Sequence, residues 1–206
     1  MTGRLIYLMG PSGAGKDTVL QGVARLLGEK AYLAPRLVTR PPTHTERSAL
    51  AVSESEFLRL ERNGALALAW RANGLAYGVR ADINLRLAVG CDVLVNGSRA
   101  YLPEARERYP AMVPVLLTVD QETLRQRLLA RGRESPEQIH ERMTRNLFYE
   151  KLENLEAAGR PLVIDNSGPV EQAILTLYRY LTSTPVSSPT PTETQAPYVA
   201  DSLRYG

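Results

Sequence analysis

The chain has 206 residues, of which 44% are hydrophobic and 23% charged, which suits one globular domain with a sizeable core and requires no second domain. Its net charge of +3 comes from basic residues interspersed with acids, a distribution that favours phosphorylated small molecules and predicts no nucleic-acid partner. Cys91 is the only cysteine, so no intrachain disulfide can form and a reducing, cytoplasmic compartment is expected.

An apolar run, residues 5–9, opens the chain and predicts a strand. It is too short for a signal peptide or a membrane span, so no membrane partner is expected. The Gly-rich segment 10–18 follows, and then a segment with helical spacing that we expect to end near Gly28. The sequence therefore predicts the order strand, glycine loop, helix.

The Gly-rich segment matches the phosphate-binding loop G-x-x-x-x-G-K-[ST], except that Asp17 stands where Ser or Thr is expected. Glycines let the backbone turn its N–H groups inward, and together with the positive end of the helix and the Lys16 ammonium they form a site for a polyphosphate. A plain turn between a strand and a helix requires neither Lys16 nor this spacing. The predicted contacts with ATP in this segment are Gly10, Ser12, Gly13, Ala14, Gly15, Lys16, Asp17 and Thr18.

The mismatch at Asp17 leaves two interpretations open. Asp17 or Thr18 can supply an oxygen ligand to the Mg²⁺ that accompanies ATP. Alternatively, Asp17 only complements the dipole in the first turn of the helix.

The next segment, about residues 39–80, differs from the rest of the chain. Leu37 and Val38 predict a short strand that runs into paired prolines, and Ser53 begins a capping box for a helix that ends at about Asn63. Extended segments 65–71 and 75–78 flank the Asn-Gly pair at 73–74, which is a hairpin signal. We therefore expect a small inserted unit with antiparallel strands.

The remaining residues alternate apolar strands with amphipathic helices, the pattern of a parallel α/β sheet with helices on both faces. The tail, 184–206, is rich in Pro, Thr and Ser and is expected to be disordered. Within the preceding domain, 1–183, strands are predicted at 92–95, 113–119 and 162–164, and helices at 81–89, 100–108, 120–130, 135–158 and 169–181.

Three further groups can reach the edge of the sheet where the loop lies. Arg40 and Tyr77 suit a second phosphate held opposite the loop, although each alone would be an ordinary surface residue. Asn166 follows the last strand and could contact adenine, or belong to a turn that caps the last helix. Arginines beside the helix break at Gly132 could close over the transferring phosphoryl group as a helical lid at about 131–145, or form a solvated face with nearby glutamates. They are Arg127, Arg131, Arg133 and Arg142.

Taken in order, these motifs resemble the guanylate kinase family of nucleoside monophosphate kinases over about residues 3–181. The resemblance implies a P-loop core with an acceptor-binding insert and a lid. It implies that Lys16 contacts the ATP phosphates, that Arg40 and Tyr77 bind the acceptor phosphate, and that the lid arginines act with Lys16 in catalysis. The motifs are 10–16 (Gly-Pro-Ser-Gly-Ala-Gly-Lys), 39–42 (Thr-Arg-Pro-Pro), Tyr77-Gly78, and Arg131 followed by Arg142.

The departures from that family concern the acceptor. Guanylate kinases read guanine with a glutamate on the strand before the hairpin, where this chain has only leucine and alanine at 66–69, and of the acids on a later strand at most Asp92 remains. A site without polar groups cannot read guanine, so GMP is not expected as the acceptor.

The chain is similar to one branch of this family, the ribose 1,5-bisphosphate phosphokinases of phosphonate degradation. That branch has Gly-Lys-Asp in the phosphate loop, as residues 15–17 do here, and a segment like 93–98. The resemblance implies Mg²⁺-dependent transfer from ATP to a phosphorylated sugar, giving 5-phosphoribosyl 1-diphosphate and ADP. The alternatives are a nucleoside monophosphate kinase with relaxed acceptor choice and a non-catalytic guanylate kinase-like binding module. The sequence carries no signal for an oligomeric state.

Overall fold

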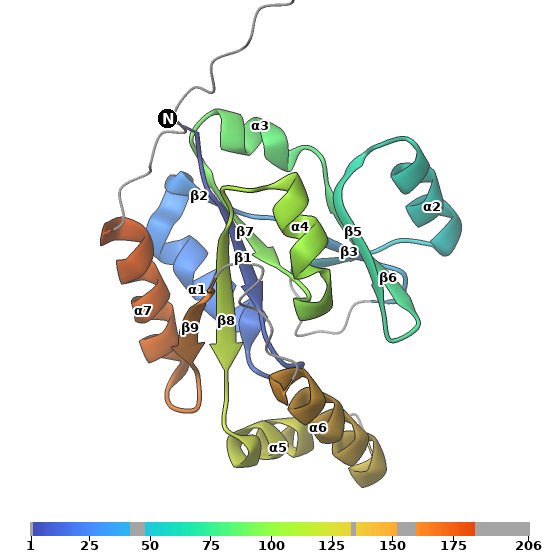
Figure 1. Cartoon of the computed structure of the whole chain (residues 1–206), viewed down its shortest axis with the longest axis vertical. Helices are drawn as coiled ribbons and strands as arrows, with labels where there is room; N and C mark the ends of the chain where they lie inside the picture. Colours follow the sequence, from blue (N-terminus) through green and yellow to red (C-terminus); the bar gives the residue numbers. More distant parts are fainter. Residues whose placement is uncertain (1, 42–47, 133–134, 152–159, 184–206) are drawn as a thin grey trace, which may run out of the picture.

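The core is a five-stranded parallel sheet in the order β2-β7-β1-β8-β9 (Figure 1). The computed structural model describes residues 2–41, 48–132, 135–151 and 160–183, without the side chains at 145 and 147–151. The predicted tail, the end of the helix expected to reach 158, and Arg133 lie outside these ranges. The strands are β1 Leu5–Met9, β2 Ala31–Leu33, β7 Asp92–Asn96, β8 Val113–Thr118 and β9 Leu162–Asp165.

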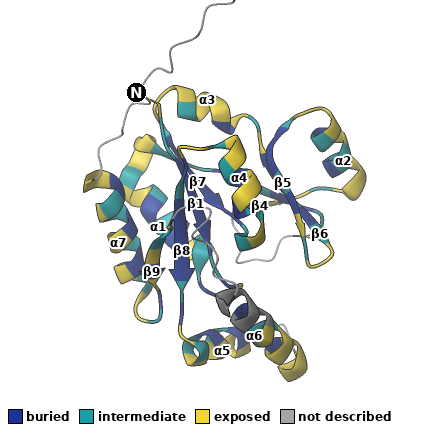
Figure 2. Cartoon of the chain, in the orientation of Figure 1, coloured by how far each residue is buried: buried dark blue, intermediate teal, exposed yellow. Residues whose placement is uncertain are grey.

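Apolar residues on both faces of β1 place it at the centre of the molecule. Ile6 and Leu8 pack with α1 (Lys16–Leu27) and α7 (Val170–Ser183), whereas Leu5, Tyr7 and Met9 pack on the opposite face with α3 (Ile83–Ala88) and α4 (Leu102–Arg108). A parallel strand that is buried on both faces needs this near-continuous apolar sequence. The burial map shows the same dark central strands under partly exposed helices (Figure 2).

The inserted unit is a second sheet of four strands in the order β4-β3-β6-β5, beside which α2 (Glu54–Arg62) packs (Figure 1). Its hairpin turns at Asn73 and Gly74, whose φ angles of 51° and 73° are both left-handed, as the predicted Asn-Gly turn requires. The prediction of antiparallel strands needs one correction, because β3 pairs with β4 in parallel. The strands are β3 Arg36–Val38, β4 Ala49–Ala51, β5 Leu66–Ala72 and β6 Leu75–Arg80.

Side-chain caps begin three helices where the sequence predicted them. Ser53 Oγ accepts a hydrogen bond from the Glu56 N–H at the start of α2, and Asp120 Oδ1 accepts one from the Thr123 N–H at the start of α5 (Gln121–Ala130). Ser135 and Gln138 exchange reciprocal bonds at the start of α6 (Pro136–Lys151), which is the complete capping box.

All five strands of the main sheet run toward one edge, where the loops after β1, β7, β8 and β9 meet. Helices α5 and α6 lie beyond this edge and the inserted sheet lies beside it (Figure 1). The residues that the sequence singled out therefore come from separate elements that face a common space. None of the helices in the described ranges is long and apolar enough to cross a membrane.

Candidate active site

The loop between β1 and α1 wraps closely because glycines take conformations that other residues avoid. Gly15 has φ 90° and directly precedes α1, and a Cβ there would lie 2.9 Å from the side-chain nitrogen of Asn166. Gly10 has φ 148°, and a Cβ there would lie 2.3 Å from the Leu117 carbonyl oxygen. The loop thus places its backbone N–H groups beside the positive, N-terminal end of α1. This geometry suits the binding of an anion.

Lys16 spans this loop from the first turn of α1. Its ammonium donates to the carbonyl oxygens of Gly10 at 2.8 Å and Pro11 at 2.9 Å. An ammonium has three N–H groups, so one remains for a phosphate. Desolvation, followed by the charge of Arg36, lowers the pKa of Lys16 to about 7. A site that opposes a cation this strongly favours an anion, since a polyphosphate relieves the repulsion.

Asn166 holds the loop from behind. It is only 2% exposed, and its amide donates to the Ala14 carbonyl oxygen at 2.6 Å. Asn166 follows β9, so this bond ties the end of that strand to the phosphate loop. The predicted contact between Asn166 and adenine stays a prediction.

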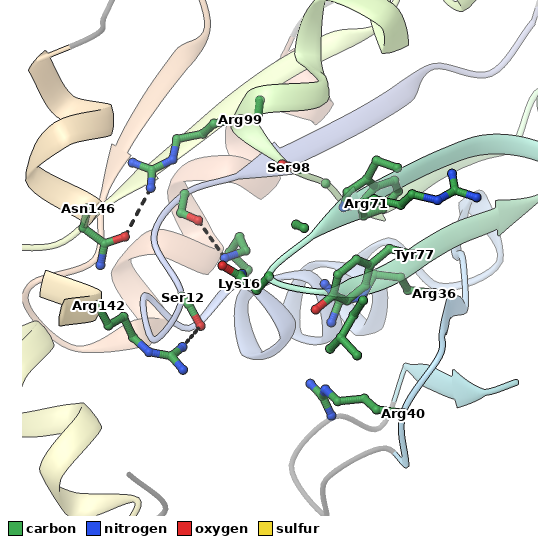
Figure 3. Close-up of a pocket in the computed structure, with 17 residues that line it drawn as sticks. Ser12, Lys16, Arg36, Arg40, Arg71, Tyr77, Ser98, Arg99, Arg142 and Asn146 are labelled. Atoms are coloured by element: carbon green, nitrogen blue, oxygen red, sulfur yellow. Dashed lines mark hydrogen bonds between the residues drawn. The ribbon is translucent and has the colours of Figure 1, made fainter. Parts of the chain in front are cut away.

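A cleft of about 450 Å³ runs from the loop to the inserted sheet (Figure 3). Its described lining is rich in cations and includes no aspartate or glutamate. Tyr77 and Arg40 lie across it from Lys16, and Arg142 reaches it from α6. The cationic lining consists of Lys16, Arg36, Arg40, Arg71, Arg99 and Arg142.

Aromatic rings support the insert side of the cleft. The Tyr77 ring stacks on Trp70 with centroids 5.6 Å apart, and the guanidinium of Arg36 lies 5.1 Å from the Tyr77 ring centre. Trp70 also stacks on Tyr101, with centroids 5.7 Å apart. These contacts restrict the positions of Tyr77 and Arg36, because flat rings stacked in series leave few alternative rotamers.

Side-chain hydrogen bonds join the described part of α6 to the core of the site. Arg142 Nη1 donates to the Ser12 hydroxyl in the phosphate loop, and Arg99 Nη2 donates to Asn146 Oδ1 at 3.2 Å (Figure 3). Arg131 is the exposed C-cap of α5, directly before Gly132. Arg127 lies outside the cleft and donates to the Gly168 carbonyl oxygen at 3.4 Å. Among the three predicted lid arginines that the structure describes, Arg142 is therefore the one with a hydrogen bond to the loop.

The first turn of α1 offers oxygen ligands for Mg²⁺. Asp17 Oδ1 accepts hydrogen bonds from Asn96 Nδ2 at 2.8 Å and from the Ser48 hydroxyl at 3.1 Å. The neighbouring Thr18 is exposed. Mg²⁺ bound to nucleotide phosphates commonly takes only one or two protein carboxylates, so a lone Asp17 fits this use. No cluster of three potential metal ligands exists among the described residues.

Several residues of the cleft were not predicted. Arg36 begins β3, Arg99 follows the loop after β7, and Asn146 lies within α6. Arg99 could have been found, because it lies shortly after a strand that ends at the same edge as β1. Asp92, the one acid that remains on β7, is structural, since its carboxylate pairs with Arg4 at 2.6 Å at the far end of the strand.

The fold and this cleft define a P-loop kinase with a guanylate kinase-like architecture. A guanylate kinase from Anaplasma phagocytophilum superposes with a TM-score of 0.66 over 88% of this chain and 85% of its own, at 19% identity. Sequence relatives are closer: three proteins, each named ribose 1,5-bisphosphate phosphokinase PhnN, come from Pseudomonas paraeruginosa, Pseudomonas fluorescens and Azotobacter vinelandii.

These relatives are 50%, 48% and 54% identical to this chain over 88%, 84% and 71% of its length. The aligned regions cover 96%, 92% and 80% of the relatives. The chain therefore belongs to the ribose 1,5-bisphosphate phosphokinase family, which confirms the branch that the Gly-Lys-Asp loop predicted. No protein-family model matches the chain.

Proposed function

We propose that the protein transfers the γ-phosphoryl group of ATP to ribose 1,5-bisphosphate, giving 5-phosphoribosyl 1-diphosphate and ADP. The cleft is the observation that carries this proposal, because Lys16 and five arginines line it and no acid occurs among its described residues. Two polyanions can meet in such a cleft, whereas a guanine base would find no carboxylate to accept its N–H groups. The names of the relatives support the same acceptor. With one cysteine in the chain, we expect the reducing cytoplasm as its compartment.

The phosphate loop is the proposed ATP site. The backbone of the loop and the Lys16 ammonium would hold the β and γ phosphates. Asp17 and Thr18 would hold Mg²⁺, which neutralises phosphate charge when bound. Asn166 supports this site through its bond to Ala14. The proposed nucleotide contacts outside the loop are Arg127 and Asn166.

The inserted sheet is the proposed acceptor site. Arg40 and Tyr77 would bind one phosphate of the acceptor, and Arg36, which lies against the Tyr77 ring, adds a cation beside them. Arg71 contributes less charge, because its guanidinium forms an ion pair with Glu61 at 2.7 Å. A ribose with two phosphates needs cations at both ends of the cleft, which the loop and the insert supply.

The reaction needs no general base. The nucleophile is a phosphate oxygen of the acceptor, and phosphate monoesters with a second pKa near ~6 are largely ionised at neutral pH. The protein then has to align two anions and stabilise the charge that develops between them. Lys16, Arg131 and Arg142 are the proposed catalytic groups, with α6 closing over the phosphates as part of a lid at about 131–145.

Phosphorus NMR of the product tests the proposal. With ATP, Mg²⁺ and ribose 1,5-bisphosphate, we expect a diphosphate coupled to the sugar C1 position to appear at the rate at which ADP forms. Transfer to a sugar hydroxyl, or ADP formation that is independent of the sugar, would refute the proposed reaction.

A further inference from the structure

The carboxylate of Asp17 is held from two directions. Asn96 ends β7 in the core and Ser48 directly precedes β4 in the insert, and both donate to the same oxygen, Oδ1. Within the described residues no hydrogen bond uses Oδ2. The second oxygen therefore has a fixed direction while remaining available to a cation at the phosphate loop.

The orientation of the Asn96 amide follows from its partner. A carboxylate only accepts hydrogen bonds, so the nitrogen of Asn96 must face Asp17 and the oxygen must face away from it. Asn96 is 5% exposed, and its Oδ1 is buried with no donor among the described residues. A buried acceptor without a donor is costly, which indicates that the site has a use for it. The side chain of Asn96 is therefore a buried amide whose described hydrogen bond is the one to Asp17.

The carboxylate and the neutral polar group of this site, at Asp17 and Asn96, stand in the reverse of the usual order. Most P-loop enzymes hold Mg²⁺ with a Ser or Thr hydroxyl on the loop and with an aspartate supplied by the Walker B segment. Here the loop carries the carboxylate of Asp17, and β7, beside the loop strand, ends in the neutral amide of Asn96. Either arrangement has a single negative charge. Two carboxylates at the observed 2.8 Å contact would repel each other or share a proton.

We propose that Asn96 is a positioning residue for the nucleotide-bound metal, and that loop and strand have exchanged roles: Asp17 supplies the carboxylate and Asn96 is the neutral partner that aims it. The proposal rests on the proposed function for the presence of a metal–nucleotide complex, and it does not depend on the identity of the acceptor. It requires the two residues to be coupled, so that one can be changed without loss only if the other changes too.

A double-mutant cycle measured by Mn²⁺ binding in the presence of ADP tests the exchange. Asp17→Ser removes the carboxylate and Asn96→Asp creates a pair of carboxylates, so each should weaken Mn²⁺ binding about 10-fold or more, as loss of metal-supporting groups does. The double variant, Asp17→Ser with Asn96→Asp, rebuilds the hydroxyl and strand acid of other P-loop enzymes. We expect it to recover to within about 3-fold of the original protein.

Two controls keep the cycle decisive. Asn63→Asp makes the same chemical change at an exposed helix end outside the cleft lining, and should leave Mn²⁺ binding unchanged. If Asn96→Asp does not fold, Asn96→Leu removes the amide without adding charge; it should weaken Mn²⁺ binding about 10-fold, and adding Asp17→Ser should not restore it. Independent, multiplying losses in the double variant, or unchanged binding in Asn96→Leu, would overturn the proposal. Because no acceptor is present, failure of the sugar assay would leave this result intact.

Discussion

Lys16 is the residue whose environment shows most directly what the site is built to bind. It bridges two loop carbonyls while Arg36, Arg99 and Arg131 repel it. Replacing it with methionine should keep the length of the side chain and remove the charge. We expect Lys16→Met to lower kcat by about 10³-fold, the scale of losing one preorganised charge at a transition state. Circular dichroism should show the same fold, and near-normal turnover would contradict the role of Lys16.

The lowered pKa of Lys16 predicts a pH dependence for nucleotide binding. With a pKa of about 7 in the free protein, Lys16 is charged below pH 7, and bound phosphates should raise its pKa. The affinity for ADP should therefore be highest below pH 7. Above pH 7 it should fall as the pH rises, with a slope that approaches a 10-fold loss of affinity per pH unit. Calorimetry in buffers of different ionisation enthalpy should detect proton uptake on binding at about pH 8. Lys16→Met should abolish this uptake, and equal uptake in both proteins would contradict the assignment.

The helix α6 is the element that joins the lid region to the phosphate loop, through Arg142 and Ser12. If this arginine stabilises the transferring group, Arg142→Ala should lower kcat by about 10²-fold or more while changing the affinity for ADP much less. Arg125→Ala is a matched control, because Arg125 is exposed on α5 outside the cleft lining. Steady-state kinetics and ADP titration of both variants check the prediction. Similar small effects of Arg142→Ala and Arg125→Ala would indicate that Arg142 belongs to a solvated helix face.

A partly buried ion pair joins the ends of three elements away from the site. Asp92 at the start of β7 is 8% exposed and accepts from the side chain of Arg4, which also donates to the Leu181 carbonyl oxygen in α7. Breaking the pair leaves the partly buried Arg4 charge without its carboxylate, so Asp92→Ala should lower the free energy of unfolding by about 2 kcal/mol. Urea unfolding measures this loss. The kinetic constants of the folded variant should be unchanged, and a selective loss of activity would mean that Asp92 acts at the site.

The elements that the sequence predicted well have a local cause. The loop glycines, the Asn-Gly turn and the helix caps at Ser53, Asp120 and Ser135 depend on neighbouring residues alone, and they occur where predicted. The short strands β2 and β4 have three residues each and were not predicted. Their pairing with β7 and β3 depends on tertiary contacts, which a three-residue pattern does not encode.

At the scale of the whole molecule, the cleft exists only because two sheets meet at one edge. The sequence predicted Arg40, Tyr77 and Arg142 in the site because they belong to motifs, but it gave no local signal for Arg36 or Asn146. Arg36 reaches the cleft through the pairing of β3 with β6, and Asn146 does so through the placement of α6 against Arg99. Their roles follow from packing between segments distant in sequence.

The central claim is that this cleft accepts a bisphosphorylated sugar and does not read a base. The most direct measurement is the ratio of kcat/KM for ribose 1,5-bisphosphate to that for GMP, taken in one coupled assay that detects ADP. With cations at both ends of the cleft and no acid in its described lining, the ratio should be at least about 10³. A ratio near one, or a preference for GMP, would contradict the account.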